Sequence, residues 1–211
     1  IDNHFKLIMI RPDQVTLAKE MIVKNRSKVT IGTVISFPEG INSLEEKLEE
    51  AQEAIDNGAD DLDFVCNYQA FIEGKLETGK SEIRKRPQIG LQQNKIVKWI
   101  IEVAALTEKQ IIQICTLIKK VVLSNFKDEL YQNVFVKSST GFYVTENKLP
   151  NGATFPAIIM MLENASPLSI KAAGGVRTYD EAVQMIKLGV KRIGTSSAIA
   201  IASGHDSGSN Y

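Results

Sequence analysis

Short apolar runs rich in β-branched residues recur along the 211-residue chain, and helix-like segments separate them. Runs of this length, bounded by turn residues, are typical of strands buried on both faces of a sheet. The predicted strands cover residues 6–10, 29–36, 61–67, 98–104, 134–139, 168–173 and 191–196. Because strands and helices alternate strictly, the sequence predicts a parallel sheet with helical crossovers.

The segments between these runs carry helix signals of different strength. Residues 43–57 begin with a capping box at Ser43 and Glu46 and end at Gly58. The apolar stripe predicted for this helix is Leu44, Leu48, Ala51 and Ile55. Residues 107–121 and 178–188 show the same pattern of a helix with an apolar stripe, and residues 14–24 and 154–162 show it more weakly.

The polar segment 74–95 gives no clear secondary-structure signal. Its basic residues are expected to lie on a solvent-exposed helix face, because the chain as a whole is neutral. They are Lys80, Arg84, Lys85 and Arg86.

Seven strand–helix units fit either an open doubly wound sheet or most of an eight-unit barrel. Two features favour the barrel: there is no early G-x-G-x-x-G turn, and polar residues gather after the later strands, where barrels carry their chemistry. We therefore predict an α/β fold, a (β/α)8 TIM barrel, as a single domain over residues 1–211 with a flexible tail at 202–211. The first barrel strand is inferred to lie upstream of Ile1 or to lack order.

Composition argues against several other classes. Lys plus Arg (25) balance Asp plus Glu (25), which argues against a nucleic-acid binder, and 44% hydrophobic residues argue against disorder. No run approaches the roughly 18 apolar residues of a membrane span. Cys66 and Cys115 lie in apolar runs and are expected to be buried, reduced thiols. We expect a cytoplasmic protein without a membrane partner.

Two lysines lie inside strands that otherwise consist of core residues. Lys137 follows Val-Phe-Val, Lys171 follows Leu-Ser-Ile, and a glycine turn comes soon after each. Burial disfavours the ammonium form of a lysine, and a second ammonium nearby disfavours it further. Schiff-base chemistry with a carbonyl substrate needs this neutral amine. One salt-bridged or snorkelling lysine per strand is the less favoured alternative, because the two stand at matching depth on consecutive strands.

An aspartate in the third predicted strand is the next candidate. Because side chains alternate along a strand, Asp61 and Asp63 share one face. A lone buried carboxylate is costly, so Asp63 is expected to have a cationic partner or to transfer protons. A structural ion pair with Lys98 or Lys137 is the alternative. Asp60 and Asp61 are expected to be charges at the start of the strand.

Glycine-rich turns follow the last three predicted strands. They are Thr140-Gly141, Gly174-Gly175-Val176-Arg177 and Gly194-Thr195-Ser196-Ser197. The later loops of barrels often bind phosphate through backbone N–H groups, hydroxyls and a helix N-terminus. Three such turns on successive strands therefore predict an anion site.

Six sequence blocks resemble the class I deoxyribose-phosphate aldolase family. They are residues 33–40, 58–67, 98–102, 135–141, 171–178 and 192–197, in the family's order and with similar spacing. The blocks F-V-K-S-S-T-G-F and I-K-A-A-G-G-V-R-T are the most specific. The ending, 204–211, resembles the Gly/Ser-rich tail with a terminal tyrosine found in one branch of the family.

The resemblance implies reversible cleavage of 2-deoxyribose 5-phosphate to glyceraldehyde 3-phosphate and acetaldehyde, in deoxyribose phosphate catabolism. It implies that Lys137 forms the Schiff base and that Lys171 is the neighbouring ammonium. It further implies that Asp63 relays protons with Lys171, that Lys98 supports the site and that Tyr211 takes part in proton exchange at the imine carbon.

The phosphate group would lie among residues of the three glycine-rich turns. By the resemblance these are Thr140, Gly141, Gly174, Gly175, Val176, Arg177, Gly194, Ser196 and Ser197. No metal or cofactor is implied, because the protonated imine is itself the electron sink. The expected partner is a small phosphorylated sugar or aldehyde, and a homodimer is the expected assembly.

Three departures from the family pattern keep an alternative open. The family's opening strand with its aspartate has no counterpart, Met9 stands where many members have cysteine, and Phe142 stands where one branch has lysine. The alternative is a catalytically silent barrel that binds a sugar phosphate or a protein partner. A third interpretation, another phosphate-binding barrel enzyme, leaves the lysine pair unexplained.

Overall fold

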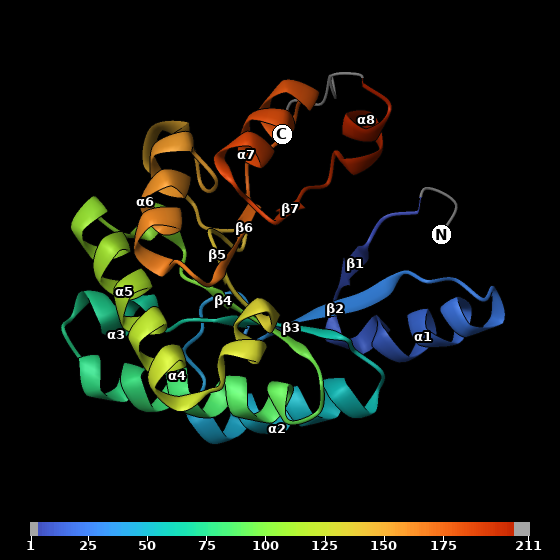
Figure 1. Cartoon of the computed structure of the whole chain (residues 1–211), viewed down its shortest axis with the longest axis horizontal. Coiled ribbons are helices and arrows are strands. Elements are labelled where there is room, and N and C mark those ends of the chain that lie inside the picture. The colour runs from blue at the N-terminus through green and yellow to red at the C-terminus, as the bar shows by residue number, and fades with distance from the viewer. Residues whose placement is uncertain (1–3, 205–211) are drawn as a thin grey trace. The chain divides into compact units, whose positions relative to one another are not determined.

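The computed structural model describes residues 4–204, with the backbone alone for 76–82, 86 and 148. The chain divides into two compact units, Ile1–Trp99 and Ile100–Tyr211. Within each unit strands and helices alternate along the chain, as the sequence predicts (Figure 1).

The first unit contains strands that follow one another in chain order. They are β1 (Leu7–Ile10), β2 (Thr30–Ile35), β3 (Asp61–Val65) and β4 (Ile96–Ile100). The pairs β1–β2 and β2–β3 are parallel. The helices are η1 (Pro12–Gln14), α1 (Val15–Lys24), α2 (Leu44–Asp56), α3 (Tyr68–Ile72) and α4 (Leu76–Leu91). Helices α2 and α4 pack side by side (Figure 1).

Helix α2 begins as predicted, and its buried face agrees in part with the predicted apolar stripe. The Ser43 hydroxyl accepts a hydrogen bond from Glu46 N, and the Glu46 carboxylate accepts one from Ser43 N, which confirms the capping box. Ala51 and Ile55 of the predicted stripe are buried, whereas Leu44 and Leu48 are half-buried. Lys47 is fully buried instead, because its ammonium donates to the Gly40 carbonyl at 2.6 Å.

The predicted strand 98–104 is displaced towards the N-terminus. Strand β4 ends at Ile100, Glu102 has a left-handed backbone (φ +55°), and η2 (Val103–Ala105) follows. A left-handed residue cannot continue a strand, so the apolar run extends beyond the strand itself.

The polar segment 74–95, which shows no clear secondary-structure signal, contains the whole of α4. Arg84 and Lys85 are exposed, as expected of a solvated helix face. The side chains of Lys80 and Arg86 lie outside the described residues.

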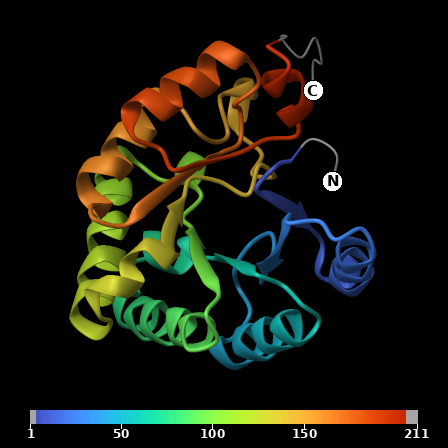
Figure 2. The same ribbon diagram turned by 45° about the vertical axis from the view of Figure 1, so that its right-hand side comes forward.

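The second unit repeats the alternation of strands and helices. Its strands are β5 (Val134–Lys137), β6 (Ser169–Ala173) and β7 (Arg192–Gly194), paired in parallel as β5–β6 and β6–β7. Its helices are η2, α5 (Glu108–Asn125), η3 (Asp128–Asn133), η4 (Glu146–Lys148), α6 (Phe155–Ala165), α7 (Tyr179–Leu188) and α8 (Ala198–Ala202). Helices α5 and α6, green and orange in Figure 2, pack against each other.

The buried residues of each unit are mostly apolar, and each unit buries one cysteine. Cys66 in the first unit and Cys115 in the second are buried free thiols, which confirms the prediction. Over residues 4–204, no helix combines the length and the apolar character that a membrane crossing needs.

Candidate active site

Lys137 and Lys171 are register partners on the parallel strands β5 and β6. Paired residues in such strands carry their side chains on the same face of the sheet. Both lysines are buried, with 5% and 3% of their surface exposed. The prediction that the two lysines stand at matching depth is therefore confirmed.

A third cation continues this row onto β7. Arg192 is the register partner of Lys171, and its guanidinium carbon lies 4.9 Å from the centre of the Phe135 ring. The ring face stabilises the guanidinium charge. The sequence did not predict a role for Arg192. Arg192 lies two residues before Gly194, a predicted site residue, so both positions are on the same face of the strand.

The turn after β5 uses its hydrogen-bond donors within the protein. Thr140 N and Thr140 Oγ1 donate to Glu102 Oε2 at 3.0 and 2.5 Å. Gly141 N donates to Ser139 Oγ at 2.8 Å. The donors expected at Thr140 and Gly141 are thus engaged with other protein groups, and Glu102, for which the sequence analysis gave no role, is buried beside them.

The turn after β6 presents donors that are not engaged in this way. Gly174 and Gly175 have left-handed backbones (φ +80° and +87°), a conformation that favours glycine. Within residues 4–204, the N–H groups of Gly175, Val176 and Ser196 donate to no protein acceptor. Thr195 Oγ1 donates to Val176 O at 2.7 Å and so ties the turn after β7 to the turn after β6. Successive open N–H groups of this kind suit an anion.

The backbone N–H groups of Arg177 and Ser197 in these two turns donate to protein acceptors. Arg177 N donates to Glu181 Oε2 at 2.7 Å, and the Arg177 side chain is exposed. Ser197 N donates to Thr195 Oγ1 at 2.9 Å. Burial would raise the pKa of the Glu181 carboxyl, but the N–H groups of Arg177 and Thr178 outweigh it and hold this pKa below its ordinary value.

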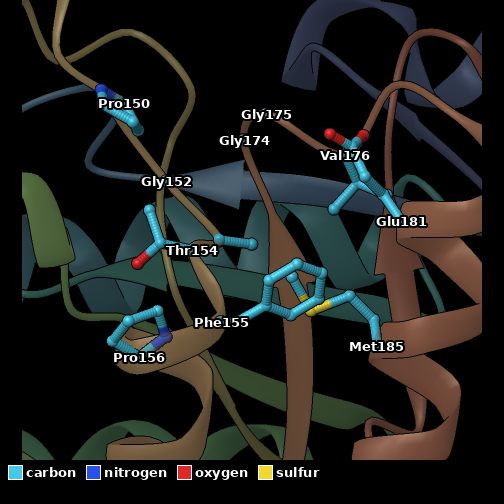
Figure 3. A pocket seen from close by; sticks show the side chains of 11 residues that line it. Pro150, Gly152, Thr154, Phe155, Pro156, Gly174, Gly175, Val176, Glu181 and Met185 are labelled. Atoms are coloured by element: carbon cyan, nitrogen blue, oxygen red, sulfur yellow. The ribbon is translucent and has the colours of Figure 1, made fainter.

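A cavity of about 290 Å³ adjoins the turn after β6 (Figure 3). In Figure 3 Phe155 and Met185 lie on one side of the cavity, and Gly174 and Gly175 lie on the opposite side. The residues that line this cavity are Pro150, Gly152, Ala153, Thr154, Phe155, Pro156, Gly174, Gly175, Val176, Glu181 and Met185. Neither Lys137 nor Lys171 is among these residues, so the cavity is distinct from the lysine pair.

A buried charge cluster occupies the first unit. Lys98 Nζ lies 2.6 Å from both Asp61 Oδ2 and Asp63 Oδ1, and all three side chains are at most 2% exposed. The expectation that Asp63 has a cationic partner is confirmed. Asp61 does stand at the start of β3, as expected, but it is buried there and shares the Lys98 ammonium with Asp63. Asp60 does lie nearer the surface, 4.0 Å from Lys19.

Comparison with known proteins places the chain in a family. No family model matches it. It is 38% identical over 201 residues to a deoxyribose-phosphate aldolase from Caldicellulosiruptor saccharolyticus, covering 94% of this chain and 83% of that protein. A deoxyribose-phosphate aldolase from Thermococcus gammatolerans is 36% identical over 205 residues, with 97% and 84% covered. The chain belongs to the deoxyribose-phosphate aldolase family.

Solved structures agree with this assignment to the aldolase family. The tetrameric deoxyribose phosphate aldolase from Aeropyrum pernix matches with a TM-score of 0.76 and 26% identity, over 96% of this chain and 78% of that one. The family, the aldolase class of lyase and the α/β fold of the TIM-barrel type predicted from the sequence are confirmed. Tyr211, the last predicted site residue, lies outside the described residues.

Proposed function

We propose that the chain cleaves 2-deoxyribose 5-phosphate reversibly to glyceraldehyde 3-phosphate and acetaldehyde, with Lys137 as the Schiff-base residue. The observation that carries this proposal is the direct register pairing of two buried lysines, Lys137 and Lys171, on one face of β5 and β6. A lysine amine is the nucleophile of Schiff-base chemistry, and in this proposal Lys137 supplies the amine that attacks the carbonyl. The complete lysine pair and the aldolase relatives do not favour a catalytically silent barrel.

The reaction balances without a redox partner. The Lys137 amine adds to C1 of the open-chain sugar, and loss of water gives a protonated imine. Removal of the C3 hydroxyl proton then breaks the C2–C3 bond, releases glyceraldehyde 3-phosphate and leaves the bonding electrons in an enamine. Protonation at C2 and addition of water release acetaldehyde and restore the amine.

We propose that the substrate phosphate binds at the turns after β6 and β7. Gly175, Val176 and Ser196 offer backbone N–H groups with no protein acceptor within residues 4–204, which supports this placement. Gly174, Gly194, Arg177 and Ser197 belong to the same two turns and complete the proposed site. Thr140 and Gly141 remain proposed neighbours of the substrate, with donors that first serve Glu102 and Ser139.

Two further roles rest on the family resemblance. We propose that Asp63 relays protons during cleavage, with Lys98 holding its carboxylate. We propose that Tyr211 assists proton exchange at the imine carbon. Deuterium exchange into the methyl group of acetaldehyde tests the second role: Tyr211→Phe is expected to slow exchange, and an unchanged rate would remove Tyr211 from the mechanism.

Three broader expectations are part of the proposal. Residues 1–211 are proposed to act as one catalytic domain, the protein to be cytoplasmic, and the assembly to be a homodimer. The Aeropyrum pernix relative is a tetramer, so light scattering on the purified protein decides between assemblies.

Reductive trapping tests the proposed chemistry directly. Protein mixed with acetaldehyde and borohydride is expected to gain an N-ethyl group on Lys137, located by peptide mass spectrometry. The exposed Lys191 serves as the internal reference for nonspecific alkylation. Labelling of Lys137 no greater than that of Lys191 would contradict the imine mechanism.

A further inference from the structure

A short segment after β4 is joined to the end of β5 within the second unit. Ile101 N donates to Lys137 O at 3.0 Å, and Val103 N donates to Ser138 O at 2.9 Å. Glu102 stands between these two bonds with 1% of its surface exposed. Its carboxylate is therefore directed at the turn that follows the proposed Schiff-base lysine.

The Glu102 carboxylate accepts hydrogen bonds from two residues of that turn. Ser139 Oγ lies 2.7 Å from Oε1, while Thr140 N and Thr140 Oγ1 both donate to Oε2. Ser139 Oγ also lies 2.6 Å from the Asn151 carbonyl, so its single proton is shared between two acceptors. Through Ser139 Oγ and Thr140 Oγ1, the same contacts hold the N–H groups of Gly141 and Phe142.

The backbone of Glu102 is held in an unfavourable conformation. Its φ of +55° lies in the left-handed region, which glycine adopts at much lower cost than a residue with a side chain. Glu102 has a buried, hydrogen-bonded carboxylate in a backbone conformation that suits glycine better. This combination indicates that the carboxylate itself is needed at this position.

We propose that Glu102 is a positioning residue, which fixes the Ser139–Gly141 turn and thereby sets the place of Lys137 at the end of β5. This inference rests on the proposed function. The carboxylate acts through hydrogen bonds rather than through its charge. A glutamine can reproduce the bonds, because its Nε2 can donate to Ser139 Oγ while its Oε1 accepts from Thr140.

Two substitutions at Glu102 distinguish the effect of its hydrogen bonds from the effects of its backbone conformation and its negative charge. Glu102→Gly removes the carboxylate and relieves the left-handed backbone, so the variant is expected to fold. Glu102→Gln keeps the shape and removes the charge. Gln110→Ala is the matched control, because it breaks the capping box at Thr107 in the same unit without touching the turn.

Amide hydrogen exchange measures the turn independently of any reaction. Glu102→Gly is expected to speed exchange of the Thr140 and Gly141 amides by about 10-fold or more, whereas Glu102→Gln and Gln110→Ala leave it near wild type. Unchanged exchange in Glu102→Gly would overturn the proposal. This readout does not depend on the proposed chemistry, so it stands even if wild-type protein traps no adduct.

Reductive trapping with acetaldehyde then measures the consequence at Lys137. Because a displacement of about 1 Å can cost about 100-fold in rate, Glu102→Gly is expected to trap at least about 10-fold more slowly than wild type. Glu102→Gln is expected to trap at nearly the wild-type rate. Normal trapping in folded Glu102→Gly would reduce Glu102 to a structural residue, and equal loss in both variants would show that the charge, not the position, matters.

Discussion

The side chain of Lys171 occupies space that exists only because residue 194 is glycine. A Cβ atom at Gly194 would stand 3.0 Å from Lys171 Cε and 3.8 Å from its Nζ. Contacts of 3.0 Å between carbon atoms are too short for unstrained packing, so the lysine would have to move. The position of the proposed second ammonium thus depends on a glycine in the neighbouring strand.

Gly194→Ala is accordingly expected to lower kcat by about 10-fold, because it displaces the Lys171 ammonium. Steady-state kinetics with 2-deoxyribose 5-phosphate measures the change. Gly32→Ala is the control, since its Cβ would crowd Met9 Sδ at 2.9 Å in the other unit. An equal fall in kcat for both variants would attribute the effect to general strain.

Lys171→Met is expected to slow imine formation at Lys137 by about 10-fold, because Lys171 is the register partner of Lys137 and its side chain lies on the same face of the sheet. The rate of borohydride trapping with acetaldehyde measures this, with Lys137→Ala as the blank. A trapping rate equal to that of wild type would show that Lys171 has no part in forming the imine.

Gly175→Ala is expected to raise KM for 2-deoxyribose 5-phosphate by about 10-fold and to leave KM for unphosphorylated deoxyribose nearly unchanged. A Cβ at Gly175 meets no atom within 4 Å, but its φ of +87° disfavours alanine, so the turn and its N–H groups shift. Gly74→Ala is a close control, because Gly74 has φ +78° and equally open surroundings in the first unit. A parallel loss for both sugars would mean that the turn has no specific part in phosphate binding.

Much of this architecture follows from local sequence patterns. The lysine pair could be predicted because each lysine interrupts a core strand at the same distance from a glycine turn, and the structure pairs them directly. The burial of Asp61 could not be predicted, since burial of a second carboxylate depends on a lysine 37 positions away that reaches both. Lys47 and Glu102 were missed because each is buried by a hydrogen bond with a turn outside its own helix or strand, which no periodic pattern reveals.

The capping box of α7, formed by Thr178 and Glu181, predicts how the stability of the fold depends on pH. The lowered pKa of Glu181 means that its ionised form contributes stability above the ordinary glutamate pKa of about 4.5, and this contribution is lost as pH falls through the lower folded-state pKa. Glu181→Gln keeps an acceptor but removes the charge, which should cost about 0.5 kcal/mol at pH 7. Thermal unfolding is expected to show a Tm difference at pH 7 that disappears towards pH 3. A difference that persists in acid would mean that the amide itself disturbs the cap.

The Lys98 cluster supplies an internal control for the role of Asp63. Asp61 and Asp63 lie at the same distance from the same ammonium and are equally buried, so neutralising either one removes one ion pair of the same kind. Loss of one partner from a buried pair typically costs about 3–5 kcal/mol, although here the second aspartate still compensates Lys98. Asp61→Asn and Asp63→Asn are therefore expected to lower stability by similar amounts. Only Asp63→Asn should reduce turnover strongly, by about 100-fold, if its carboxylate relays protons.

Denaturant unfolding and kcat, measured on both variants, separate the two effects. The rate of acetaldehyde trapping adds a further distinction. A residue that moves protons during cleavage of the C–C bond should affect turnover more than it affects the rate at which the imine forms. If Asp61→Asn and Asp63→Asn lose turnover equally, the cluster acts as a structural unit and Asp63 has no separate catalytic part. If only Asp63→Asn loses it while both are equally destabilised, the carboxylate at 63 takes part in the chemistry.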